Sequence, residues 1–254
     1  KASDFNFTFQ TSDLSKLSII DKISTVEEEA IVKEARFGYI KEHGKHERLN
    51  LFMGGRLALR QAIKTSYNMN HTDLTNIIPL YTPEVLNMPI LVNDFGAPLL
   101  STDYRGSISH KHQYATAIAI HTGSNSTIYT HNTGYIGVDI EKCTNKAYNK
   151  LKQRLFTEHE QTNININSLH NNITIEEEIM LRFSFKESIY KAINPYLKRY
   201  VEFKEVEVEP LPDGTGRIEF YLRTGEQFHY IAEWRRFNKD YWITVVYAWQ
   251  ICIK

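Results

Sequence analysis

The sequence has few cysteines, no surplus of charge and no long apolar run, and each absence excludes a class of protein. Two cysteines among 254 residues are too few for a disulfide scaffold and fit a reducing compartment. Lys and Arg together number 30, as do Asp and Glu, so no overall field attracts nucleic acid or an anionic membrane. No apolar stretch approaches the length needed to cross a bilayer.

No targeting segment is visible either. The sequence begins with Lys1 rather than Met, which is compatible with a processed leader or a trimmed chain. We therefore expect a protein of the cytoplasm or of an organelle stroma or matrix, with no membrane and no nucleic acid among its partners.

Common catalytic and nucleotide-binding motifs are also missing. The chain has no Walker A loop and no Gly-x-Gly-x-x-Gly. Ser109 and His110 follow one another, but without the Gly-x-Ser-x-Gly elbow of a hydrolase. His110 and His112 form a His-x-His pair, yet zinc needs further ligands and the sequence offers no clear partner cluster.

Hydrophobic periodicity and turn residues predict an α+β chain with an antiparallel-leaning set of strands and helices in each half. The Asn-rich stretch 161–172 is expected to be a loop, and Pro195 to end the helix before it. The polar stretch 122–127 is the best boundary between the halves. The predicted helices cover residues 25–43, 47–66, 145–156 and 174–194; the predicted strands cover 5–9, 106–109, 115–121, 135–141, 201–208, 217–222, 227–234 and 241–253.

Two acids follow each other at i and i+2 in the apolar run that starts at Tyr135. On a strand, Asp139 and Glu141 point to the same face, while Val138 and Ile140 point to the other. The simple alternative is a strand that ends in water, the usual fate of terminal carboxylates. The pattern otherwise indicates a pair of ligands for a cation.

A second group of charges lies on residues 183–191 of the helix predicted for residues 174–194. Glu187 and Lys191 are i,i+4 neighbours on one face, whereas Lys186 lies roughly 100° around the helix from Glu187. Their simple alternative is an exposed ion pair worth a few tenths of a kcal/mol. If the helix brings Glu187 to the two strand acids, three carboxylates suit Mg²⁺ and the lysine suits phosphate. The pattern favours metal-assisted phosphoryl chemistry.

Arginines recur on the helix predicted for residues 47–66. Arg56 and Arg60 are i,i+4 neighbours, and Arg48 lies two turns before Arg56. They form either a solvated basic stripe, the commoner outcome, or a clamp for a phosphate group, which the guanidinium fork suits.

Four segments, in this order along the chain, resemble the motifs of the two-lobed, Sfp-type 4′-phosphopantetheinyl transferases. They are Gly106-Ser-Ile-Ser-His110, Gly137-Val-Asp-Ile-Glu141, Arg154-Leu-Phe-Thr-Glu-His-Glu160 and Phe183-Ser-Phe-Lys-Glu-Ser-Ile-Tyr-Lys191. With their surroundings they span roughly residues 96 to 195. Phe183 stands where tryptophan is commoner in this family.

One further departure concerns the segment before the Ser-His motif. Many relatives have Gly-Lys/Arg-Pro there, but this chain has Gly96-Ala-Pro98. The phosphate contact of that basic residue is either absent or supplied by another residue, for which Arg105 is our candidate.

The resemblance implies two similar lobes in a pseudo-two-fold arrangement, each with an antiparallel sheet and packed helices, and an active site in the cleft between them. Residues 1–124 would form the lobe that binds coenzyme A phosphates, and residues 125–254 the lobe that binds metal. A monomer with pseudo-dimeric lobes is expected.

The implied activity is transfer of 4′-phosphopantetheine from coenzyme A to a serine of an apo acyl, peptidyl or aryl carrier protein, with release of adenosine 3′,5′-bisphosphate. Asp139, Glu141 and Glu187 would hold Mg²⁺, with Mn²⁺ as a candidate substitute. Glu187 would act as the base, Asp139 as a catalytic metal ligand, and Lys191 would stabilise the pyrophosphate and the leaving group. The pathway, whether of fatty acids, polyketides or nonribosomal peptides, is open.

The same resemblance assigns the remaining ligands of coenzyme A. Ser109 and His110 would bind its phosphates together with Lys191. Arg48, Arg56 and Arg60 would bind its 3′-phosphate, because Gly55-Arg-Leu-Ala-Leu-Arg60 resembles the family's phosphate-binding helix.

Two other functions stay open at this point. A different Mg²⁺-dependent phosphohydrolase or nucleotidyl transferase could use the same acids, without needing the arginine helix or Ser109 and His110. A non-catalytic protein that binds coenzyme A or a carrier protein would show tight binding without transfer.

Overall fold

The computed structural model describes residues 9–13, 51, 54–63, 66, 90–122, 134–144 and 148–251. The helix predicted for residues 25–43, most of the strand predicted for 5–9 and most of the boundary 122–127 lie outside these ranges, as does Arg48.

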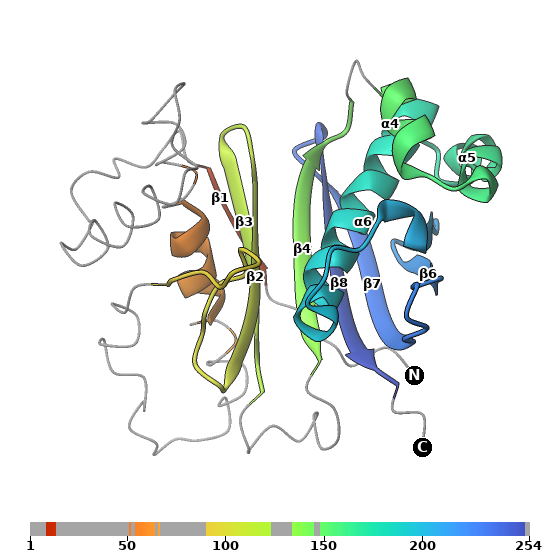
Figure 1. Cartoon of the computed structure of the whole chain (residues 1–254). Helices are drawn as coiled ribbons and strands as arrows, with labels where there is room; N and C mark the ends of the chain where they lie inside the picture. The colour runs from red at the N-terminus through yellow and green to blue at the C-terminus, as the bar shows by residue number, and fades with distance from the viewer. Residues whose placement is uncertain are drawn as a thin grey trace, which may run out of the picture. The chain divides into compact units, whose positions relative to one another are not determined.

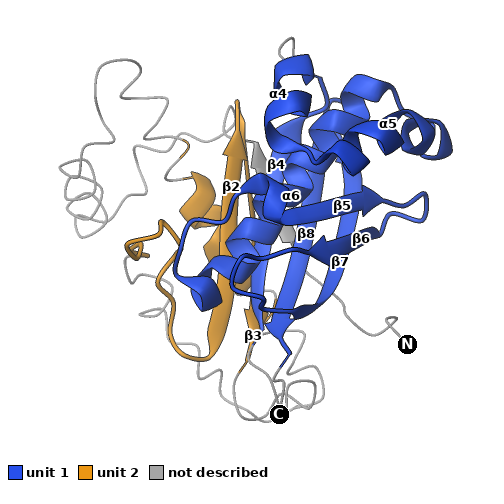
Figure 2. Ribbon diagram, turned by 45° about the vertical axis from the view of Figure 1, so that its right-hand side comes forward, with its two compact units in different colours: residues 1–6, 127–254 blue, residues 7–126 orange. Residues whose placement is uncertain are grey.

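The chain divides into two compact units (Figure 2). One consists of Phe7–Ser126, and the other of Lys1–Asn6 together with Thr127–Lys254.

The unit Phe7–Ser126 contains an antiparallel sheet of three strands and a helical segment, residues 54–63. The strands are β1 (Phe9–Asp13), β2 (Tyr104–Lys111) and β3 (Tyr114–His121), in the order β1-β3-β2. Figure 1 shows the helical segment beside the sheet. Small residues allow a close approach, since Ala58 and Ala62 of the helix pack in one apolar cluster with Ala117 and Ala119 of β3.

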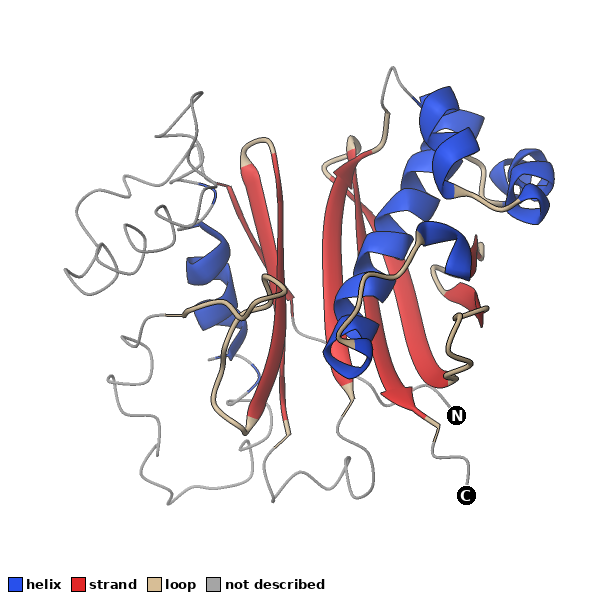
Figure 3. Ribbon diagram, in the orientation of Figure 1, coloured by secondary structure: helices blue, strands red, loops and turns tan. Residues whose placement is uncertain are grey.

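The unit Thr127–Lys254 contains a second antiparallel sheet, a β-hairpin and several helices (Figure 3). The sheet strands β4 (Tyr135–Lys142), β7 (Phe228–Phe237) and β8 (Tyr241–Gln250) take the order β4-β8-β7. The hairpin pairs β5 (Val206–Pro210) with β6 (Gly216–Phe220). The helices are α4 (Tyr148–Leu155), α5 (Glu158–His170), α6 (Ile175–Leu197) and the short 3₁₀ helix η4 (Phe203–Glu205).

The two sheets share one topology. In each, the first strand is followed along the chain by helix, and the third strand then takes the central place between the first and the second. The predicted α+β class with antiparallel sheets is confirmed.

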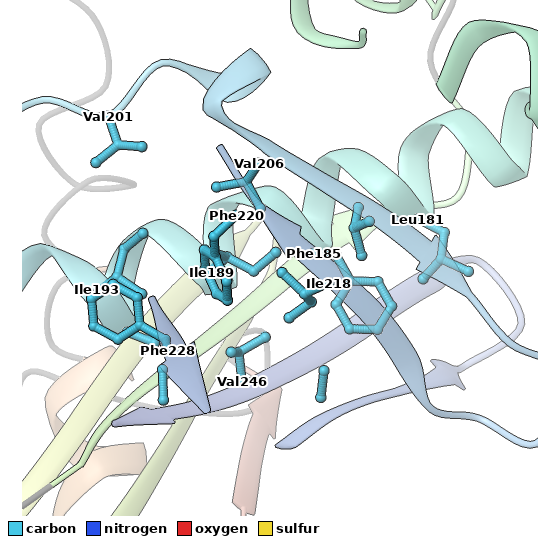
Figure 4. Close-up of a cluster of buried hydrophobic side chains, with 14 of the residues drawn as sticks. Leu181, Phe185, Ile189, Ile193, Val201, Val206, Ile218, Phe220, Phe228 and Val246 are labelled. Carbon is cyan, nitrogen blue, oxygen red and sulfur yellow. The ribbon is translucent and has the colours of Figure 1, made fainter. Parts of the chain in front are cut away.

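The core of the second unit forms around α6. Leu181, Phe185, Ile189 and Ile193 recur at every fourth position, and all are at most 1% exposed. Figure 4 shows them pointing toward apolar side chains of β5, β6, β7 and β8. Burial of each such side chain contributes about 1.5–3 kcal/mol, so α6 is the element that holds this unit together.

Charged groups are buried on another face of α6. Lys186 Nζ donates to Glu160 Oε2 at 2.8 Å and to the carbonyl of Phe203 at 2.7 Å. Arg182 Nε donates to Glu178 Oε1 at 2.9 Å, and all four side chains are 2% exposed or less. Burial lowers the pKa of Lys186 and raises the pKa of Glu178. The bonds of Lys186 tie α6 to α5 and to η4, whereas Arg182 and Glu178 both belong to α6.

The loop predicted for residues 161–172 is wrong, because most of this stretch belongs to α5. Thr157 and Glu160 form a capping box at the start of α5. This box is a helix signal within the motif 154–160, but the asparagines that follow it favoured a loop. Ile164 and Asn167 are buried, so tertiary packing outweighs the weak helix propensity of asparagine.

The end predicted for α6 is also wrong. The helix begins, as predicted, after the capping box of Thr174 and Glu177, but it runs through Pro195 to Leu197. Pro195 lies in the last turn, and Lys198 ends the helix with a left-handed backbone, φ 49°. The strand predicted for residues 201–208 begins only at Val206, after η4.

Among the described helices, none combines the length and the apolar character needed to span a membrane.

Candidate functional site

Strand β4 and helix α6 touch through their backbones at one point. A Cβ atom on Gly137 would lie 2.0 Å from the carbonyl oxygen of Ser188 and 2.9 Å from the nitrogen of Ala192. Only glycine permits this approach. The face of β4 that carries Gly137, Asp139 and Glu141 therefore packs against α6.

Asp139 is consequently a buried acid, and the alternative of a carboxylate exposed at the end of a strand is wrong for this residue. Its side chain is 5% exposed. Lys191 Nζ donates to Asp139 Oδ1 at 2.9 Å and to the carbonyl of Val138 at 2.9 Å, and Ser184 Oγ donates to Asp139 Oδ2 at 2.9 Å. Donors from a single helix thus engage both carboxylate oxygens.

Hydroxyl groups extend this contact to the central strand. Thr244 of β8 is the register partner of Asp139. Its Oγ1 lies 3.0 Å from Ser184 Oγ and 2.7 Å from Ser188 Oγ, and Ser188 Oγ also donates to the carbonyl of Thr244 at 3.0 Å. The network fixes α6 against β4 and β8, and so places the backbone of Lys191 beside Asp139.

The other two predicted metal ligands, Glu141 and Glu187, are both half-buried. Glu187 follows Ser184 by three residues and precedes Lys191 by four, so it shares their face of the helix. Within the described part of the chain, however, no three His, Cys, Asp or Glu side chains gather closely enough to hold a metal ion. The donor types suit a hard cation, but Asp139 is bound by Lys191 instead.

Lys186 does not point toward Asp139 but binds Glu160 of α5. This agrees with its angular offset from Glu187 on the helix. Its partner Glu160 is the last residue of the motif 154–160, and Phe156 of the same motif is fully buried beneath the ammonium group, with Nζ 5.4 Å from the ring centroid. Phe183 packs against the apolar cores and lies 6.0 Å from the ring of Phe203. These motif positions therefore support the fold.

In the unit Phe7–Ser126, the Ser-His motif lies on β2. Residues 106 and 108 face the helical segment. A Cβ atom on Gly106 would meet Leu59, and the side chain of Ile108 lies where a Cβ atom on Gly55 would be. By the alternation of a strand, His110 points to this face and Ser109 to the other. Ser109 is buried and His110 is exposed.

The two described arginines of the helical segment do not form a solvated stripe. Arg56 is 7% exposed, and its Nε donates to the carbonyl of Ile90 at 2.9 Å. Arg60 is half-buried, and burial lowers the pKa of its guanidinium group. Both lie on the element that His110 faces, whereas Ser109 lies on the opposite face of the sheet.

Arg105, the candidate substitute for a missing basic residue, caps its own turn. Its Nη1 donates to the carbonyls of Thr102 at 3.0 Å and of Tyr104 at 2.9 Å. The segment that lacks the basic residue is a tight turn, in which Gly96 has φ 80° and Asn93 Oδ1 accepts the backbone N–H of Ala97.

Residues 135–246 match the model of the 4′-phosphopantetheinyl transferase superfamily. These residues are a domain of this superfamily, the transferase domain of this chain. The match lies within the unit Thr127–Lys254 and includes β4, α6 and the contact between Asp139 and Lys191. The transferase domain supports a function in phosphopantetheinyl transfer. A comparison with curated proteins gave no match.

The transferase domain also has a small pocket between α5, α6 and the hairpin of β5 and β6. It is lined in part by Asn167, Arg182, Val208 and Arg217, and its volume is about 40 Å³. Arg182 Nη2 and Asn167 Nδ2 are buried there without a hydrogen-bond partner among the described residues. This volume suits about three water molecules. It is far too small for a nucleotide, so we do not assign it to the chemistry.

Sequence reasoning missed Ser184 and Thr244, which position Asp139. Ser184 lies three residues before Glu187 within the last motif, so its helical face was a usable signal. Thr244 gave no signal, because only the register of β4 with β8 brings it opposite Asp139.

Proposed function

We propose that the protein transfers the 4′-phosphopantetheine group of coenzyme A to a serine hydroxyl of an apo carrier protein and releases adenosine 3′,5′-bisphosphate. The observation that carries the proposal is the contact of the buried Asp139 with the partly exposed Lys191. Two motif segments far apart in the sequence meet there, inside the matched residues 135–246. A buried carboxylate beside a partly exposed ammonium group suits a site that must handle both a cation and a phosphate.

Asp139, Glu141 and Glu187 would hold the divalent cation, Mg²⁺ with Mn²⁺ as a substitute. Their oxygen donors suit a hard ion that keeps part of its shell for water and phosphate. When bound, this cation would offset the negative charge of the pyrophosphate.

The protein's own residues would carry the proton and orient the phosphate. Glu187, directly or through one water molecule, takes the proton of the carrier serine. The serine oxygen forms a bond to the phosphorus that carries pantetheine as the phosphoanhydride bond breaks. Lys191 stabilises the charge that develops on the departing bisphosphate.

The lobe of residues 1–124 would bind the phosphates of coenzyme A, and the lobe of residues 125–254 would supply the acids, with the reaction in the cleft between them. Arg48, Arg56, Arg60, Ser109 and His110 are the proposed phosphate ligands. The common strand order of the two sheets supports a pseudo-two-fold pair of lobes within one monomer.

The partner would be an acidic helical carrier protein of fatty acid, polyketide or nonribosomal peptide synthesis. It would dock on basic and apolar residues of the second lobe, in a reducing compartment.

The test is the intact mass of an apo acyl carrier protein after incubation with this protein, coenzyme A and Mg²⁺. We expect a gain equal to one phosphopantetheine group, and no gain with a chelator or with Asp139→Ala. Asp139→Asn, which keeps the shape and a partner for Ser184, guards against loss of the fold and is checked by circular dichroism.

Other outcomes point to other functions. Binding of coenzyme A without transfer to several carriers would favour a binding protein. Hydrolysis that is insensitive to Arg56→Ala and His110→Ala would favour a different metal-dependent enzyme. Neither binding nor transfer would overturn the assignment.

A further inference from the structure

We propose that Lys191 is an exchangeable counter-ion of Asp139: it holds the carboxylate while the site is free of ligands, and it must leave before a divalent cation can bind there. The inference rests on the proposed function and extends it. It makes the binding of metal and of the phosphate substrate depend on one another through a single side chain.

The contacts identify which partner can move. Asp139 is held by Ser184 at Oδ2 and its side chain is 5% exposed, whereas the side chain of Lys191 is 27% exposed. A lysine ammonium group stands on a flexible stem of four carbons and reaches new positions without movement of the backbone. Exchange therefore occurs by withdrawal of the lysine, while the acid stays in place.

The ammonium group and a metal ion compete for the same oxygen. Lys191 Nζ lies 2.9 Å from Asp139 Oδ1, and Mg²⁺ would need this oxygen at about 2.0–2.1 Å. Two cations at one buried carboxylate oxygen would lie within about 5 Å of each other, where their repulsion amounts to several kcal/mol at an intermediate dielectric. Metal and lysine are therefore alternative occupants of Oδ1.

A substrate phosphate gives the displaced lysine a new partner. Lys191 exchanges one anionic oxygen for another, so its departure from Asp139 leaves no ammonium group unpaired. Because coupling between two ligands is reciprocal, coenzyme A promotes metal binding and the metal promotes binding of coenzyme A.

Neither neighbouring lysine can take this part. Lys186 is buried and bound to Glu160 and to two backbone carbonyls. Lys142, the last residue of β4, is exposed. Lys142 therefore provides a matched control, since its removal deletes a positive charge near the site without touching the contact of Asp139 with Lys191.

The experiment measures Mn²⁺ binding to the ligand-free protein by calorimetry or electron paramagnetic resonance, and separately coenzyme A binding with a chelator present. We expect Lys191→Met to bind Mn²⁺ about tenfold more tightly than the wild type. The same variant should bind coenzyme A several-fold more weakly. Lys142→Met should resemble the wild type in both measurements.

A higher affinity for Mn²⁺ together with a lower affinity for coenzyme A, in Lys191→Met but not in Lys142→Met, is the result that exchange predicts. Unchanged Mn²⁺ affinity in Lys191→Met, an equal gain in Lys142→Met, unchanged coenzyme A affinity, or no Mn²⁺ binding by any of the proteins overturns the proposal. If Lys191→Met does not fold, Lys191→Gln keeps an uncharged donor for Asp139 and carries the same expectations. Failure of the proposed function would appear separately, as absence of carrier modification.

Discussion

At the scale of single residues, the two lysines of the last motif, Lys186 and Lys191, both pair with a buried carboxylate but differ in their own exposure. Lys191 is partly exposed and pairs with Asp139 beside the proposed phosphate site. Lys186 is enclosed and pairs with Glu160. Exposure separates a lysine that can change partners from one that cannot, although both belong to one motif.

Replacement of Lys186 by methionine should destabilise the protein by roughly 3 kcal/mol, because the buried carboxylate of Glu160 loses its nearer counter-ion and keeps only Arg182, at 3.9 Å. Urea unfolding at neutral pH measures this loss. The exposed Lys150→Met on α4 is the matched control and should change stability by about 0.5 kcal/mol or less.

The double variant Lys186→Met with Glu160→Gln separates the pair from the packing of its members. The introduced glutamine would be neutral and could still accept the backbone N–H of Val208, which in the wild type lies 3.1 Å from Glu160 Oε1. We expect the double variant to recover part of the stability that Lys186→Met loses. Equal stability of Lys186→Met and Lys150→Met would contradict the structural role.

At the scale of elements, the approach of β4 to α6 depends on one glycine. Gly137→Ala should destabilise the protein by roughly 3 kcal/mol, because the new Cβ would lie 2.0 Å from the carbonyl oxygen of Ser188 and neither backbone can yield cheaply. Thermal or urea unfolding measures the change.

Gly225→Ala tests whether the loss of stability in Gly137→Ala comes from crowding of the new Cβ atom and not from loss of glycine as such. Gly225 has φ 80° and nothing within 4 Å of its missing Cβ, so alanine there meets backbone strain alone, about 1 kcal/mol. If both variants lose the same stability, the close approach of strand and helix is not what requires Gly137.

The elements show where sequence reasoning succeeds. The start of α6 was predicted because Thr174 and Glu177 form a local capping box. α5 begins with the same kind of box at Thr157 and Glu160, but its asparagines favoured a loop. The decisive contacts of α5, between Glu160 and Lys186 and around Ile164, join distant segments and leave no periodic trace in a single sequence.

The candidate site was predictable to a similar degree. Alternation along β4 told which residues share a face with Asp139, but not that α6 covers this face. Gly137 carried the missing information, since glycine within a strand often indicates a close backbone approach. The partners of Asp139, Lys191 and Ser184, follow only from the packing of the helix on the strand.

At the scale of the whole molecule, the two units repeat one arrangement of strands without visible similarity of sequence. The order of strands depends on which backbone segments pair. Sequence identity depends on which side chain occupies each position of those segments. The first strand of each sheet illustrates this. β1 and β4 take the same place in the strand order, but their sequences share no motif.

The pH dependence of stability is a property of the whole chain, and Glu205 should dominate part of it. Its carboxylate joins three segments, accepting Arg199 Nη2 at 2.8 Å and the backbone N–H groups of Arg223 at 3.0 Å and Glu202 at 2.9 Å. Burial alone would raise the pKa of Glu205, but these hydrogen bonds outweigh it and lower the pKa to about 2.

Because the folded pKa of Glu205 lies below its usual value of 4.5, the group stabilises the folded state above pH 4.5 and loses this effect as the pH falls toward 2. Partial exposure of Arg199 and Arg223 reduces the contribution to about 2 kcal/mol. Urea unfolding of the wild type and of Glu205→Gln should therefore differ by this amount at pH 7 and converge below pH 4.5. Glu233→Gln, an exposed site on β7, should follow the wild type throughout. The free energies of unfolding of the wild type and of Glu205→Gln could instead differ by a constant amount from pH 7 to pH 3. The glutamate would then contribute through its shape and hydrogen bonds, and its charge would have no part in the acid sensitivity of the fold.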